Sequence, residues 1–147
     1  MQETAVTTIS HVIQLAVAPV FLLAGIGSIL SVMNHRMSRV MDRARVLEAK
    51  QEENIVDAHV IEKELATLST RAGLVIKAIT LCTMTALFIC AVIATLFLGA
   101  TFKFNTGTIV SFLFITAMLC FFIGLLIFLR EIFIAMANLR VGKYVDS

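Results

Sequence analysis

The sequence predicts an all-α membrane protein: three transmembrane helices, with a cytoplasmic helical hairpin between the first and the second. Of its 147 residues, 59% are hydrophobic and 15% are charged, whereas soluble domains contain about 45–50% and about 25%. The apolar residues also gather in three segments, each close to the roughly 20 residues with which a helix crosses a bilayer. A chain of this length leaves room for a single membrane domain, residues 1–147.

The apolar segments cover residues 12–33, 74–98 and 109–129. We expect helices there, because in lipid a single segment satisfies its backbone groups only as a helix. Residues 1–11 lead into the first segment, residues 34–73 form the hairpin, residues 99–108 form a turn, and residues 130–147 form a tail. The N-terminus lacks the basic region of a secretory signal, so we expect the first segment to stay in the mature protein.

Lysine and arginine are distributed unevenly between the two sides of this arrangement. Eleven of the 12 lie in the hairpin, in the tail or at the start of the second segment, and only Lys103 lies in the turn. Because these residues concentrate in cytoplasmic loops, we expect the hairpin and the C-terminus in the cytoplasm. The N-terminus and the 99–108 turn would then be outside.

Two runs of apolar residues at three- and four-residue steps predict the arms of the hairpin. They are Met37, Val40, Met41, Ala44 and Leu47 in one arm, and Val56, Val60, Ile61, Leu65 and Leu68 in the other. The polar letters KQEEN at 50–54 separate them, so we expect the reversal near 51–54 and each arm to continue its neighbouring span. The apolar seams would join the two arms of one chain or, as a coiled coil, arms of different copies.

Arg36, Arg39 and Arg43 fall on one side of the first arm, close to the expected membrane surface. Two interpretations stay open: contacts to anionic lipid headgroups, or the basic cytoplasmic mouth of a pore. A net charge of +2 without aromatic stacking platforms argues against binding to nucleic acid.

The spans carry faces of small and polar residues, which is where membrane helices approach one another closely. We expect these faces to line a pore or an interface between copies: Gln14, Ala18, Gly25 and Ser28 in the first span, and Lys77, Thr80, Thr83, Met84, Ala91 and Thr95 in the second. Pro19, with Gly25 and Gly27, predicts a kink or hinge. Lys77 and Glu131 lie at similar depths, so we expect them to form an ion pair.

No residue pattern indicates catalysis or a cofactor. The three cysteines lie singly in apolar segments and the three histidines are scattered, so no set of ligands is spaced for a metal. The chain also lacks a Ser/His/Asp set, a phosphate loop and paired carboxylates within the spans. We therefore expect neither enzymatic activity nor a bound cofactor.

The stretch from Ile13 to Glu48 contains a recognisable series of elements: Gln14, the run Ala18-Pro19-Val20-Phe21-Leu22-Leu23, small residues, and Arg39 followed by Asp42-Arg43-Ala44-Arg45. It resembles the N-terminal signature of a bacterial family of short membrane proteins, the domain of unknown function 2721 family. The resemblance implies the inner (plasma) membrane of a bacterium and a plan of one span, a polar stretch and two closely connected spans. It implies no activity, but it makes Pro19 and the 39–45 segment part of a recurrent design.

Two functions remain open from these observations. The first is a homo-oligomer that conducts small ions, in which a small polar face lines the axis and the basic residues raise the anion concentration at the mouth. The second is a non-conducting scaffold or regulator that docks a cytoplasmic protein through the helical hairpin.

Overall fold

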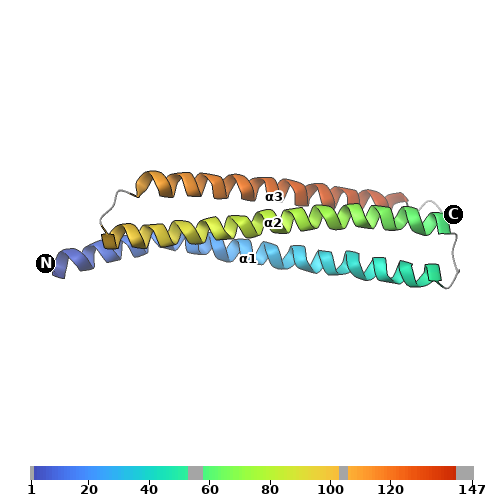
Figure 1. Cartoon of the computed structure of the whole chain (residues 1–147), viewed down its shortest axis with the longest axis horizontal. Coiled ribbons are helices and arrows are strands. Elements are labelled where there is room, and N and C mark those ends of the chain that lie inside the picture. The colour runs from blue at the N-terminus through green and yellow to red at the C-terminus, as the bar shows by residue number, and fades with distance from the viewer. Residues whose placement is uncertain (1, 53–57, 103–105, 142–147) are drawn as a thin grey trace. The chain divides into compact units, whose positions relative to one another are not determined.

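The computed structural model consists of three helices, which follow one another as α1 (Gln2–Glu52), α2 (Ala58–Phe102) and α3 (Gly107–Val141) (Figure 1). It describes residues 2–52, 58–102 and 106–141, with side chains over 9–50, 59–102 and 106–137. All three helices are long and apolar enough to cross a membrane. The all-α class is confirmed, and the chain is a multi-pass membrane protein.

The helices extend well beyond the apolar segments. As predicted, α1 runs without a break from the first span into the first arm, and α2 runs from the second arm into the second span. Continuity follows from the composition, since no Gly or Pro occurs between positions 28 and 72. The predicted reversal lies largely outside the described residues, because α1 ends at Glu52.

Two boundaries differ from the sequence prediction. The turn predicted at 99–108 is shorter, because α2 continues to Phe102 and α3 begins at Gly107. The backbone N–H of Val110 donates to the Thr106 carbonyl at 3.0 Å, which closes the first turn of α3. The segment predicted as a tail from residue 130 onward is helical up to Val141.

The chain forms two compact units, and each contains part of all three helices. The apolar unit consists of Met1–Leu30 and Leu81–Phe122, and the charged unit of Ser31–Thr80 and Ile123–Ser147. Among the apolar unit's residues with described side chains, none is Asp, Glu, Lys or Arg. The two units, which were divided by their internal contacts, therefore also differ in their content of charged residues.

Small side chains let α2 and α3 approach each other in the apolar unit. Its buried residues include Val12, Ala16, Ile26, Cys82, Thr85, Ile89, Val92 and Ala117. The Thr85 hydroxyl lies 2.9 Å from the Leu81 carbonyl and 3.3 Å from the Ala117 carbonyl across the helix pair. A Cβ on Gly99 would lie 2.6 Å from the side chain of Thr106, so a larger residue at this point of the α2–α3 connection would require Thr106 to shift.

The two arms of the predicted hairpin pack against each other in the charged unit. Val40 and Leu47 of α1 form a core with Ile61 and Leu68 of α2, and Ala44, Leu65 and Ala72 cover it. The structure thus places the arm-to-arm seam within one chain. Met41 and Val60, which the periodicity assigned to the seam, are instead 41% and 55% exposed, so they lie outside the core between the arms.

Candidate functional site

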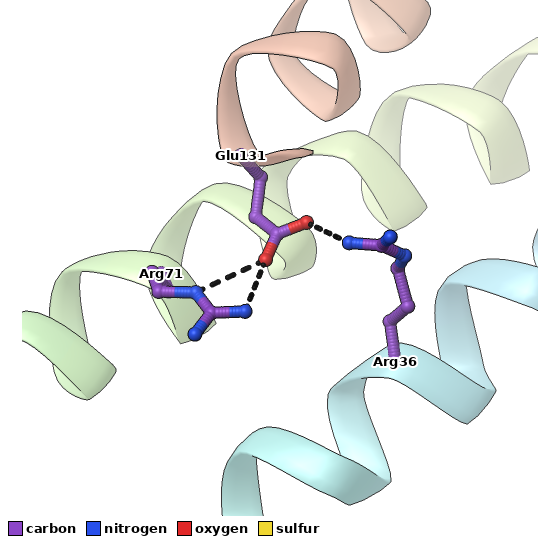
Figure 2. A network of polar contacts seen from close by, with 3 residues as sticks. All are labelled: Arg36, Arg71 and Glu131. Carbon is purple, nitrogen blue, oxygen red and sulfur yellow. Dashed lines mark hydrogen bonds and ion pairs between the residues drawn. The ribbon is translucent and has the colours of Figure 1, made fainter. Parts of the chain in front are cut away.

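Three charged side chains from three different helices meet in the charged unit. Arg36 comes from α1, Arg71 from α2 and Glu131 from α3 (Figure 2). Arg36 follows the first predicted span by three residues, Arg71 precedes the second by three, and Glu131 follows the third by two. The three side chains therefore come from equivalent ends of the three spans, and we call them the Arg–Glu–Arg network.

Both oxygens of the Glu131 carboxylate accept hydrogen bonds. Arg36 Nη1 donates to Oε2 at 3.0 Å, while Arg71 donates to Oε1 from Nε at 3.2 Å and from Nη2 at 2.9 Å. The two guanidinium groups approach the carboxylate from opposite sides (Figure 2). Hydrogen bonds between charged groups are roughly twice as strong as neutral ones, so this carboxylate is firmly held.

Burial is unequal within the network. The Glu131 side chain is 0% exposed, whereas those of Arg71 and Arg36 are 20% and 36% exposed. A buried carboxylate without partners would be strongly destabilising, and the two arginines supply its charge balance and its donors. With two cations and one anion, the network keeps one net positive charge.

An aromatic ring supports the more exposed arginine. The Cζ atom of Arg36 lies 5.7 Å from the centre of the Phe128 ring, on the same helix as Glu131. This is within the range of a cation–π interaction. Phe128 and Glu131 together hold the Arg36 guanidinium in one orientation.

A second ion pair joins the arms. Arg43 donates to Oε1 of Glu64 from Nε at 3.1 Å and from Nη2 at 2.6 Å. The side chains are 62% and 38% exposed, so the pair contributes at most about 1 kcal/mol. Of the three arginines predicted as a stripe, Arg36 and Arg43 thus have acidic partners, and Arg39 forms no ion pair with any residue that the structure describes.

The predicted ion pair between Lys77 and Glu131 is replaced by the Arg–Glu–Arg network. Lys77 is exposed, and on α2 it is Arg71, not Lys77, that pairs with Glu131 of α3. Lys77 follows Arg71 by six positions, which turns the lysine about 120° around the helix relative to Arg71. Equal depth along the spans did not identify the partner of Glu131, because the partner must also lie on the face of α2 that turns toward α3.

Most residues of the predicted polar faces are exposed on the single chain. On α1 these are Gln14, Ala18, Gly25 and Ser28; on α2 they are Lys77, Thr80, Thr83 and Met84, while Ala91 and Thr95 are partly buried. Several hydroxyls bond to a carbonyl of their own helix, as Ser28 does with Ala24, Thr80 with Ile76 and Thr95 with Ala91.

The predicted hinge residues lie inside α1. Pro19 is buried within the continuous helix. Gly25 and Gly27 are exposed, and a Cβ on either would meet no atom within 4 Å. Close packing inside the chain therefore does not require glycine at these two positions.

Sequence reasoning missed Arg71 and Phe128 as parts of the site. A signal was present, because each expected span has one charged residue two or three positions beyond its inner boundary. Glu131 is acidic, whereas the corresponding residues of the other two spans are arginines, which favours ion pairing at that level. Over the residues that the structure describes, no group of three or more His, Cys, Asp or Glu side chains is placed to hold a metal ion.

Comparisons with known proteins locate the chain in one family. No curated protein and no solved structure matches it. The profile of a family described as "Protein of unknown function (DUF2721)" matches residues 16–141. This region contains all members of the Arg–Glu–Arg network together with Pro19 and most of all three helices. Because the match covers most of the chain, the protein belongs to the DUF2721 family.

Proposed function

We propose that the protein forms a homo-oligomer in the inner membrane of a bacterium and that this assembly conducts small ions. The observation that carries the proposal is the exposed polar face of α1, and above all Gln14. The Gln14 side chain is exposed within the first span, and its amide has no hydrogen-bond partner among the described residues. In lipid, amide side chains of this kind bond across helices, and each such bond contributes about 0.6–2 kcal/mol.

The hydroxyl groups of the α2 face have less need than the Gln14 amide of a hydrogen-bond partner in another copy of the chain. Thr80 and Thr95 already donate to carbonyls of α2. The α1 face is therefore the better candidate for contacts between copies, and its small residues Ala18 and Gly25 allow close approach. Between 11% and 22% of the residues in the most apolar stretch of each helix are buried within the chain, which leaves ample surface for such contacts.

The oligomer is tested by replacing Gln14 with leucine. We expect native mass spectrometry of the purified Gln14→Leu protein to show a shift from oligomer to monomer. Leu15→Ala, on a neighbouring exposed position, is the control and should leave the oligomer intact. An unchanged subunit number in Gln14→Leu would refute the role of this face.

Conduction is tested by planar-bilayer recording of the pure protein across a salt gradient. The proposed mouth carries the net positive charge of the Arg–Glu–Arg network together with Arg39, so we expect a preference for anions. Arg39→Gln should reduce this preference. Arg130→Gln is the matched control, because it removes an exposed arginine outside the proposed mouth. An absence of current under voltage, low pH and tension, from a protein that still forms oligomers, would refute conduction.

The proposal includes an orientation with the charged unit at the cytoplasmic side and the N-terminus outside. It rests on the bias of eleven to one in Lys and Arg. Fusions of a fluorescent protein to the C-terminus should fluoresce, and fusions of alkaline phosphatase there should be inactive. The opposite result would reverse the orientation.

A second function is favoured by a different observation. Met41, Val46 and Val60 lie outside the spans, yet they are 41%, 53% and 55% exposed. Exposed apolar residues on a charged helical hairpin fit a scaffold or regulator that docks a cytoplasmic protein. Replacing the three by serine should then abolish a specific interaction in co-purification, while an unchanged set of partners would count against docking.

A further inference from the structure

We propose that Arg36 and Arg39 form a binding site for a phosphate group, with Glu131 and Phe128 as positioning residues for Arg36. The site goes beyond ion conduction and does not depend on it, since a chain that conducts nothing would still bind the phosphate. The membrane phospholipids are the first source to consider, because of the depth at which the two arginines lie.

The geometry of Arg36 leaves its best binding edge unused. Only Nη1 of this guanidinium contacts Glu131 (Figure 2), and Nε and Nη2 form no hydrogen bond with the residues that the structure describes. The Nε–Nη2 edge carries two parallel N–H groups, which match two oxygens of one phosphate. The Arg36 side chain is 36% exposed, so a ligand can reach part of it.

Arg36 is also held in advance in a binding orientation. Glu131 fixes one end of the guanidinium at 3.0 Å, and the Phe128 ring supports it at 5.7 Å. A long side chain ordinarily loses rotational freedom when it binds a ligand, and this loss weakens binding. In Arg36 much of that freedom is already lost in the folded chain.

Arg39 supplies the second cation of the site. It lies three positions after Arg36 on α1, which places the two residues next to each other on the helix surface. Arg39 forms no ion pair with the described residues, and Asp42, the next acidic residue on this side, does not bind it. Arg43 is excluded from the site because Glu64 occupies it.

The depth of the two arginines matches that of lipid phosphates. The headgroup layer on each side of the hydrocarbon core is about 5–8 Å thick. At 1.5 Å per residue, Arg36 lies about 4.5 Å and Arg39 about 9 Å beyond the predicted end of the first span. The backbone of Arg36 thus falls within the headgroup layer, and that of Arg39 lies just beyond its outer limit.

The experiment is a titration of the purified full-length protein in neutral detergent, with lipid adducts counted by native mass spectrometry. Phosphatidylglycerol is the probe, diacylglycerol is the control without phosphate, and inorganic phosphate is the soluble competitor. We expect a phosphatidylglycerol adduct that diacylglycerol does not replace. Arg36→Gln should weaken it about tenfold, since it loses a two-point, charge-assisted contact, and Arg39→Gln about threefold.

Three variants test whether binding depends on the geometry of the site or on positive charge alone. Arg45→Gln removes the same charge from an exposed position that forms no ion pair with the described residues, and it should change binding less than twofold. Glu131→Gln makes the region more positive, so charge alone predicts tighter binding, whereas loss of positioning predicts binding about fivefold weaker. Phe128→Leu leaves the charge unchanged and should also weaken binding, which keeps the test decisive if Glu131→Gln does not fold.

Each outcome decides the proposal. Equal binding by the wild type and Arg36→Gln would overturn it, as would tight binding by both Glu131→Gln and Phe128→Leu. Saturable binding of inorganic phosphate that Arg36→Gln abolishes, without a lipid adduct, would support the site and assign it to a soluble phosphate group. If all three arginine variants weaken binding equally, charge alone is responsible and the site is refuted.

Discussion

Replacing Arg36 and Arg71 together by methionine should destabilise the protein strongly. Glu131 would stay fully buried and lose the donors of all three hydrogen bonds, at 2.9–3.2 Å. Leaving one partner of a buried ionic network behind costs about 3–5 kcal/mol. Because both arginines keep some contact with solvent and Glu131 keeps none, most of this loss arises from the stranded carboxylate.

Removing the carboxylate as well should restore stability. In the triple variant with methionine at positions 36, 71 and 131, no buried charge remains, and apolar side chains of similar volume fill the space. Such replacements are often neutral or stabilising, so we expect a free energy of unfolding within about 1 kcal/mol of the wild type. Three substitutions would then be less harmful than two.

The assay is thermal unfolding in detergent, followed by circular dichroism and by the fraction of protein that stays soluble. For a chain of this size about 1 kcal/mol corresponds to roughly 3 °C, so the double variant should unfold about 10 °C below the wild type. The matched control replaces Arg39 and Arg45, which form no ion pair within the described part of the chain, and should shift the midpoint by less than about 3 °C. A triple variant as unstable as the double one would refute the reasoning, because the loss would not come from an unpaired carboxylate.

Three further predictions follow from contacts within single units. Replacing Arg43 or Glu64 by glutamine should cost less than about 1 kcal/mol, since the pair is exposed, and high salt should remove the difference in unfolding temperature. Leu68→Ala in the core between the arms should cost about 2–4 kcal/mol and lower the unfolding temperature accordingly, unless the core collapses around the cavity. Gly99→Ala should destabilise by about 1–3 kcal/mol, because the new methyl meets Thr106 at 2.6 Å. A second change, Thr106→Ala, should recover part of that loss; a fully stable Gly99→Ala protein would show that the α2–α3 connection shifts easily.

Much of the fold could be predicted because it depends on local patterns. Three apolar segments of sufficient length predicted three membrane helices, and the apolar steps from Val40 to Leu68 predicted arms that pack together. The limits of the helices were less predictable. Residues after Leu129 are more polar, but Ile132 and Ile134 are partly buried, and this packing continues α3 beyond the expected span.

The site was less predictable because it depends on the rotation of three helices at once. The sequence indicated that cations gather at one end of the spans, and it singled out Arg36 and Glu131 separately. Choosing between Arg71 and Lys77 as the partner of Glu131 requires knowing which face of α2 turns toward α3. That information comes from packing in the charged unit and cannot be obtained from depth alone.

The single carboxylate among the arginines has a consequence for how the three helix segments of the charged unit are aligned. Their core is built mainly from Val, Leu, Ile, Met and Ala, residues that could pack almost as well if one helix slid along another by a turn. A slide of α3 by one turn would carry Glu131 about 5.4 Å along the helix axis away from both guanidinium groups, and a slide of α1 or α2 would separate it from one of them. The Arg–Glu–Arg network thus distinguishes one alignment of α1, α2 and α3 from its near equivalents, a discrimination that the apolar seam by itself does not provide.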